Sequence, residues 1–408
     1  MTFTVLAAIF CLVLASAIKL WVDRWYISYP VLMVLAGFLS SEALIAQGID
    51  TGLRYYHVDW FISAFLVPTV IFNTTISFNE QSLYEDKIYF FYLIVGVYGL
   101  TILIATALLY FAMNHPSGFP WVAACLTSSI LAATNTRVIS DLLKNSGISM
   151  RLLSLLKGES LISSVLSLSI VSFLLSQITP QAHAHYHLWL IQLFITFIVP
   201  ILTGIGLGFL AKRLLSKNKD VVAAILFLMS CVYGLYFINS SLFNASGSIA
   251  VFVFGLFAKQ TVQENLAIKQ YWQANSFLAT LLMFFILGMT VTVTMFTERW
   301  LAMIIGITAI LIARYLSLTT GFSLISKMTT QKMITLKEQL LLSTSGTRGA
   351  LAIALAFMLP ETLDYWWTIQ SIVFGVVLFS IFVQAPIAAY WQKVWIKGSF
   401  NGDKHANY

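Results

Sequence analysis

Long apolar runs separated by short polar stretches dominate the hydrophobic pattern of this chain. Because about 20 apolar residues in a helix cross the hydrocarbon core of a bilayer, each run predicts one membrane-spanning helix. We therefore expect an all-α polytopic membrane protein with about thirteen such helices. Their ranges are 3–21, 26–46, 58–78, 88–112, 118–143, 150–176, 188–211, 220–240, 244–260, 271–296, 300–324, 338–360 and 366–392.

Two of these spans contain residues that interrupt a helix. Thr134-Asn135-Thr136 lies in the middle of the fifth span, and Ser345-Gly-Thr-Arg-Gly349 lies in the twelfth. Unwound backbone at membrane depth persists only where it is buried in protein or lines a wet cavity. In transporters built from inverted repeats, such breaks lie near the midplane and form the substrate site. Ordinary packing of small residues between helices is the alternative.

The composition agrees with a membrane protein. Of 408 residues, 59% are hydrophobic and 10% are charged, whereas a soluble domain has about 25% charged residues. Cys11, Cys125 and Cys231 lie in apolar runs without a Cys-x-x-Cys spacing, so packing is favoured over a redox or metal role. No nucleophile, metal or nucleotide motif occurs in the loops. An enzyme is therefore the least favoured class, and no cofactor or metal is expected.

The net charge of +7 follows from membrane topology rather than from a nucleic-acid partner. If the N-terminus faces outward, 18 of the 23 lysines and arginines fall in inner connections or in the C-terminal tail, and only Arg54 and Arg299 lie outside. The positive-inside rule therefore predicts an outer N-terminus and a cytoplasmic C-terminus. The first apolar segment has no preceding positive region, so it is read as a retained span rather than a cleaved signal.

Several motifs resemble those of one transporter family. Lys157-Gly-Glu-Ser-Leu-Ile-Ser-Ser164 is similar to Glu-Gly-Glu-Ser-Leu-Leu-Asn-Asp in the NhaP/NHE-type sodium/proton antiporters. Further segments match family landmarks in the same order, and this shared order is a stronger signal than any single match. They are Pro68–Asn73, Leu131–Thr136, Ser246–Ala250, Phe285–Gly288, Ala313-Arg314, Gly346–Ala350 and Phe382–Gln384. We identify the chain as a divergent member of the monovalent cation/proton antiporter family.

The resemblance implies a homodimer in the bacterial inner membrane, with an inverted-repeat fold in which two broken helices cross. It favours a broken helix at 134–136. A mobile core, approximately residues 58–176 and 271–360, would carry the ion against a dimerisation scaffold made of the remaining helices. In the family, an Asn-Asp pair beside the crossing supplies a carboxylate that binds either a cation or protons.

This chain departs from the family at that chemistry. Asn73, Asn135 and Ser164 occupy positions of family acids, while Ser163 replaces the paired Asn and Thr136 replaces a Pro. A serine hydroxyl can coordinate a cation but does not titrate near neutral pH. Sodium/proton exchange by the family's usual route therefore lacks its carrier.

Five ionisable residues are predicted at membrane depth, where a charge costs about 2.5–3.5 kcal/mol on insertion scales. By resemblance, Glu159 and Arg348 are expected to form a structural ion pair across the core, and Arg314 is also structural. For Glu159, a role as ion ligand is the alternative. Arg137 and Asp141 are four residues apart, so an internal salt bridge on one helix face is the simplest reading. Otherwise Arg137 attracts the carboxylate of an organic solute, and Asp141 is a relocated proton carrier.

A hydroxyl- and amide-rich pocket is predicted from Thr134, Asn135, Thr136, Ser160, Ser163 and Ser164. Such a lining suits a polar solute, a weakly held cation or water, and hydrogen bonding between helices is the alternative. His183, His185 and His187 lie in an outer loop, where a solvated polar loop is favoured over zinc binding or acid sensing.

The leading hypothesis is a secondary active transporter whose partners are the bilayer, protons and a small cation or a small polar or anionic solute. Cation exchange through Asp141 or Glu159 is slightly preferred over transport of an anionic or zwitterionic organic solute at Arg137. A non-transporting sensor or scaffold is the competing class. The lost acids became Asn and Ser rather than apolar residues, which indicates a wet cavity and favours transport.

The topology is testable with reporter fusions. Green fluorescent protein fused after Tyr408 is expected to fluoresce, and alkaline phosphatase fused in the loop that contains Arg54 is expected to be active, because each reporter works only on its own side of the membrane. The opposite pattern would contradict the predicted orientation.

Overall fold

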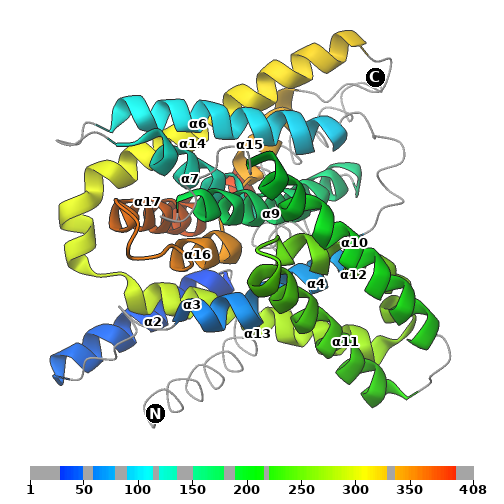
Figure 1. Cartoon of the computed structure of the whole chain (residues 1–408). Coiled ribbons are helices and arrows are strands. Elements are labelled where there is room, and N and C mark those ends of the chain that lie inside the picture. The colour runs from blue at the N-terminus through cyan, green and yellow to red at the C-terminus, as the bar shows by residue number, and fades with distance from the viewer. Residues whose placement is uncertain are drawn as a thin grey trace, which may run out of the picture. The chain divides into compact units, whose positions relative to one another are not determined.

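The computed structural model describes residues 28–48, 58–78, 90–113, 119–135, 150–178, 189–215, 220–328 and 336–391. Every regular element in these ranges is helical (Figure 1). Nine described helices are long and apolar enough to cross a membrane, and Ile62–Ser77 and Trp121–Ala132 are shorter apolar helices. The all-α polytopic fold is therefore confirmed, while the count of thirteen spans stays a prediction because residues 3–21 lie outside the described ranges.

The helices follow the predicted spans closely. The α-helices are α2 (Tyr29–Ala46), α3 (Val58–Phe61), α4 (Val67–Ser77), α6 (Tyr98–Ala112), α7 (Trp121–Ala132), α9 (Met150–Ile178), α10 (Trp189–Leu215), α11 (Val221–Phe237), α12 (Gly247–Glu264), α13 (Leu266–Thr290), α14 (Val293–Met328), α15 (Leu336–Ser345), α16 (Ala350–Phe357) and α17 (Trp366–Phe379). Four π-helical turns extend them, η1 (Ile62–Leu66), η3 (Tyr92–Val97), η6 (Ile238–Leu242) and η7 (Ser380–Gln384).

Polar caps explain several helix starts. The Asp220 carboxylate accepts a hydrogen bond of 2.9 Å from the Val222 amide at the start of α11, and the Asn265 side chain accepts one of 3.1 Å from the Ala267 amide at the start of α13. The predicted boundary between the spans 271–296 and 300–324 is wrong. The connection lies earlier, because the Thr292 hydroxyl accepts the Met295 amide at 3.2 Å and starts α14 there.

The chain divides into two compact units. Unit 1 comprises Met1–Phe78, Val165–Glu298 and Ile353–Gln370, and unit 2 comprises Asn79–Ser164, Arg299–Ala352 and Ser371–Tyr408. These limits differ from the predicted core of 58–176 and 271–360, so the assignment of core and scaffold stays a prediction.

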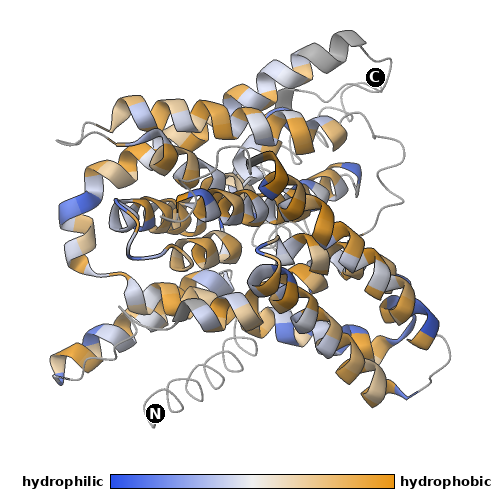
Figure 2. Ribbon diagram, viewed as in Figure 1, coloured by the Kyte–Doolittle hydropathy of each residue, from blue (hydrophilic) through white to orange (hydrophobic). Residues whose placement is uncertain are grey.

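Unit 1 is built on close helix contacts. In α2 and α13, Gly37 and Gly288 face each other so closely that a Cβ on Gly288 would lie 2.2 Å from the Val34 carbonyl oxygen. The Phe72 ring packs 4.5 Å from Trp272, centroid to centroid. Figure 2 shows apolar residues along α10 and α11 with hydrophilic residues toward their ends, as expected for helices that face lipid.

Unit 2 carries both interrupted helices. The Thr101 hydroxyl of α6 donates to the Ser317 hydroxyl of α14 at 3.2 Å, and the Tyr92 hydroxyl of η3 donates to the Ser317 carbonyl at 2.9 Å. Polar groups at membrane depth are thus paired between helices. This arrangement holds α14 beside the elements that form the candidate site.

The contact between α2 and α13 yields a stability test. Gly288→Ala is expected to destabilise the protein by about 1–3 kcal/mol, because the added methyl overpacks a backbone contact. Gly206→Ala in α10 is the control, since its Cβ would meet nothing within 4 Å. Thermal unfolding in detergent measures both variants, and equal melting temperatures would contradict the close contact.

Candidate solute site at two broken helices

The first break follows α7. This helix ends at Ala132, and Ala133 has an extended conformation with φ −62° and ψ 116°. The turn places the Thr134 carbonyl outside α7, although Thr134 is only 2% exposed. A buried carbonyl needs another partner, and serines of α9 provide it.

The second break lies between α15 and α16, at Gly346–Gly349. Its two glycines are required by space. A Cβ on Gly346 would lie 2.1 Å from Nε of Arg314, and a Cβ on Gly349 would lie 2.3 Å from Nδ2 of Asn135. Any larger residue would therefore displace a side chain of the site.

The two breaks cross and bond to each other. The Asn135 amide donates to the Thr347 carbonyl at 2.7 Å, and the Thr347 hydroxyl donates to the Asn135 carbonyl at 2.6 Å. The two unwound segments thus pair backbone groups that lie outside the described helices. The prediction of two crossed broken helices is confirmed.

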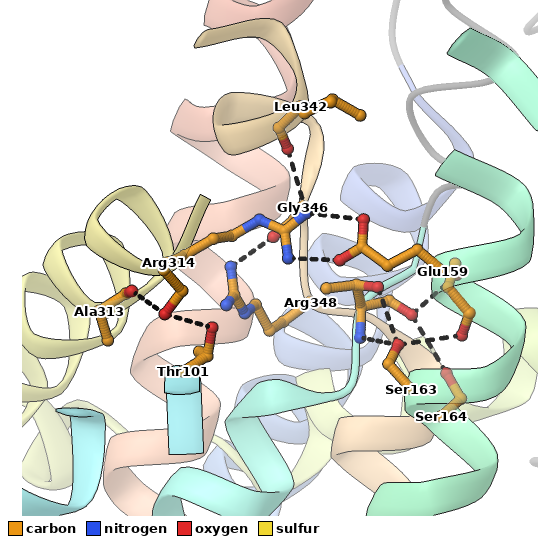
Figure 3. A network of polar contacts seen from close by, with 12 residues as sticks. Thr101, Glu159, Ser163, Ser164, Ala313, Arg314, Leu342, Gly346 and Arg348 are labelled. Carbon is orange, nitrogen blue, oxygen red and sulfur yellow. Dashed lines mark hydrogen bonds and ion pairs between the residues drawn. The ribbon is translucent and has the colours of Figure 1, made fainter. Parts of the chain in front are cut away.

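A compact group of hydroxyls surrounds the Thr134 carbonyl. We call Thr134, Ser160, Ser163 and Ser164 the hydroxyl cluster, of which Figure 3 labels Ser163 and Ser164. The Ser160 and Ser164 hydroxyls donate to this carbonyl at 2.9 and 3.1 Å, and the hydroxyls of Thr134 and Ser163 are 3.0 Å apart. The predicted grouping of these four residues is therefore found, and their bonds also hold α9 against the first break.

The ion pair of the core differs from the predicted one. Nη1 and Nη2 of Arg314 donate to Oε1 and Oε2 of Glu159 at 2.7 and 3.1 Å, and Nη2 also donates to the Leu342 carbonyl at 3.0 Å. Figure 3 shows the two planar groups facing each other. The expected pairing of Glu159 with Arg348 is wrong, because α14 brings a second arginine whose fork matches the carboxylate in bidentate geometry.

Arg348 is fully buried, with 0% exposure, and makes its hydrogen bonds to backbone. Its Nε donates to the Leu131 carbonyl at 2.8 Å, and its Nη1 donates to the Gly346 carbonyl. Within the described ranges its Nη2 has no partner. The carbonyls at helix C-termini carry partial negative charge, which explains why the guanidinium is held there.

Sequence reasoning did not assign a site role to Gln384 in η7. Its Nε2 donates to the Thr344 carbonyl at 3.0 Å and lies 3.5 Å from the Gly346 carbonyl, at the open end of α15. A lone amide in an apolar span reads as packing. Its separation from other polar residues left no signal beyond the family landmark Phe382–Gln384.

Other predicted residues are not part of this cluster. Asn73 lies on α4 in unit 1, where it is 6% exposed. Thr136, Arg137, Asp141 and the histidines of 183–187 lie outside the described residues, so their roles stay predictions. In the described part of the chain, no three His, Cys, Asp or Glu side chains form a group that could hold a metal ion.

Comparison with known proteins identifies the family. The profile described as "Sodium/hydrogen exchanger, transmembrane" matches residues 6–391. This chain belongs to that family. Its members transport ions, so the prediction that the protein is not an enzyme is confirmed.

Relatives within the family cover most of the chain. The low-affinity Na(+)/H(+) antiporter NhaS1 of Synechocystis sp. is 27% identical over 88% of this chain and 68% of its own length. The Na(+)/H(+) antiporter ApNhaP of Aphanothece halophytica is 28% identical over the same shares. The structure of the sodium proton antiporter MjNhaP1 from Methanocaldococcus jannaschii superposes with a TM-score of 0.79 at 17% identity, over 97% of this chain and 98% of that one. This last likeness supports the antiporter fold.

A double-mutant comparison tests the partner of Glu159. Glu159→Gln is expected to destabilise the protein by about 3–5 kcal/mol, because Arg314 is left as an uncompensated buried charge. Adding Arg314→Gln is expected to recover a large part of this loss, whereas adding Arg348→Gln is not. Thermal unfolding in detergent measures all three variants. If adding Arg348→Gln to Glu159→Gln restored stability and adding Arg314→Gln did not, the result would contradict the observed pairing.

Proposed function

We propose that this multi-pass transporter of the sodium/proton antiporter type carries a small anionic or zwitterionic solute at the crossing of its broken helices. The observation that carries the proposal is the buried charge of Arg348. Arg314 already occupies the only carboxylate among the described residues of the site, Glu159. Among the residues that the structure describes, Arg348 has carbonyl partners for Nε and Nη1, and its Nη2 has no partner.

The formal charges favour an anion. The charged residues of the site that the structure describes, Arg314, Arg348 and Glu159, together carry one net positive charge. The C-terminal ends of α7 and α15 offset about half a charge each, and the start of α16 returns about half, so the site stays positive. At an effective dielectric constant of about 20, a cation about 5 Å from Arg348 is repelled by about 3 kcal/mol, which is roughly a hundredfold in affinity.

The hydroxyl cluster is suited to the remaining polar groups of such a solute. The Ser164 proton is used by the Thr134 carbonyl, so its oxygen presents lone pairs to a ligand. Lone pairs accept hydrogen bonds from an ammonium or hydroxyl group. A zwitterion could therefore bind with its carboxylate toward Arg348 and its donor toward the cluster.

Cation/proton exchange is the second candidate, because relatives such as NhaS1 are named Na(+)/H(+) antiporters and hydroxyl oxygens also coordinate cations. Since Glu159 is held by Arg314 through two hydrogen bonds, this route needs Asp141 as its titrating carboxylate. The homodimer, the bacterial inner membrane, the outer N-terminus and the division into core and scaffold belong to the same proposal and are supported by family membership.

Counterflow in proteoliposomes tests the charge preference without assuming a coupling ion. Vesicles are loaded with unlabelled glutamate, succinate or glycine, and for at least one of these compounds they are expected to accumulate its radiolabelled form from outside. Vesicles loaded with sodium are expected not to accumulate labelled sodium. Ser164→Asp adds a negative charge and is expected to lower the organic counterflow at least about tenfold, and the matched neutral variant Ser164→Asn lowers it less.

The opposite results separate the two candidates. Sodium counterflow that disappears in Asp141→Asn would support cation exchange and overturn the anionic solute. Absence of every counterflow in the native protein would overturn transport of these solutes and favour a sensor or scaffold.

A further inference from the structure

Gln384 lies where its amide can control the second break. The side chain is 6% exposed, and the Ser380 hydroxyl donates to its Oε1 at 2.9 Å. This bond fixes which end of the amide faces α15, so the donor Nε2 points to the Thr344 and Gly346 carbonyls. Ser380 and Gln384 are the first and last residues of η7, and π-helical turns frequently occur at functional sites.

Gln384 and Arg348 share one acceptor. The Gly346 carbonyl accepts from Nη1 of Arg348, and Nε2 of Gln384 lies 3.5 Å from the same oxygen. A carbonyl oxygen has two lone pairs and accommodates both donors. If Arg348 turned toward a ligand, a buried carbonyl would lose a partner at considerable cost. Gln384 is close enough to keep this carbonyl paired.

We propose that Gln384 is a positioning residue. When Arg348 leaves the Gly346 carbonyl to bind the solute, Nε2 of Gln384 remains as the hydrogen-bond donor to that carbonyl. The inference rests on the proposed function, because it concerns the same arginine and the same anionic group. It adds a residue of the last span to the site and explains why this residue carries an amide group. A carboxamide supplies the donor without adding charge beside Arg348.

Two substitutions at Gln384 distinguish the effect of losing its hydrogen-bond donor from the effect of adding a negative charge. Gln384→Leu keeps an apolar side chain of similar size but has no donor, so the Gly346 carbonyl depends on Arg348 alone and Arg348 is less available. Gln384→Glu also lacks the donor when ionised and brings a carboxylate that competes with the solute for Arg348. Gln370 in α17 is the matched control, because its Nε2 donates to the Ala356 carbonyl at 3.4 Å, away from the break.

Formate, the smallest carboxylate, is the probe. Melting temperatures of the full chain in detergent are measured against formate concentration, with chloride at equal ionic strength as reference. Gln384→Leu is expected to raise the half-saturating formate concentration about fivefold, and Gln384→Glu at least about tenfold, in line with the loss of one hydrogen bond and the gain of a competing charge. Gln370→Leu and Gln370→Glu are expected to leave it unchanged.

The outcomes distinguish three cases. The positioning role is supported if formate stabilises the Gln384→Leu variant less than the native protein and the Gln384→Glu variant least. The melting temperature without formate should then change little in both variants. If the Gln384 variants alter only the formate-free melting temperature, Gln384 is a structural cap and the inference is overturned while the anion preference stands. If formate does not stabilise the native protein, the proposed anion preference fails, and the inference fails with it.

Discussion

The requirement that buried backbone groups find partners at membrane depth shapes this structure. Two helices are interrupted among buried residues, so the freed backbone groups must bond to the other break, to side chains or to a solvated cavity. The reciprocal bonds between Asn135 and Thr347 meet this requirement. Other carbonyls at the breaks and helix ends accept hydrogen bonds from side chains, namely from the serines of α9, Arg314, Arg348 and Gln384. The polar residues of the site are therefore also the residues that make the crossing possible.

The same residues explain how a family member can lose acids and keep the fold. At two positions that the motif resemblance assigns to family acids, this chain has Asn135 and Ser164. The backbone of Asn135 bonds to Thr347 across the crossing, and the Ser164 hydroxyl donates to the Thr134 carbonyl. The bonds of Asn135 use backbone atoms and do not depend on its side chain, and the Ser164 hydroxyl donates as a neutral group. Neither side chain carries a charge, and the proposed preference for an anionic solute depends on the resulting electrostatic balance around Arg348.

Much of this arrangement could be predicted from the sequence. Apolar runs locate the helices, and polar or glycine-rich interruptions in those runs locate both breaks. The buried ion pair could not be assigned, because Arg314 and Arg348 both lie at membrane depth and only the path of α14 decides which one reaches Glu159. Gln384 was missed for a related reason, since its role depends on carbonyls that become available only when α15 ends. The start of α14 was misplaced because a single capping hydroxyl, that of Thr292, outweighs the hydropathy pattern there.

The distance along the chain between the partners of the ion pair has a consequence for biogenesis. Glu159 and Arg314 are separated by 155 residues, so at about 5–20 residues per second the ribosome delivers the arginine roughly 8–30 s after the glutamate. During this interval Arg314 is not yet available to Glu159, although a lone charge in the bilayer is costly. Until α14 follows, a hydrated or protein-lined environment or protonation of the carboxyl would lower this cost for the nascent α9, so the order of membrane insertion bears on how the protein reaches its fold.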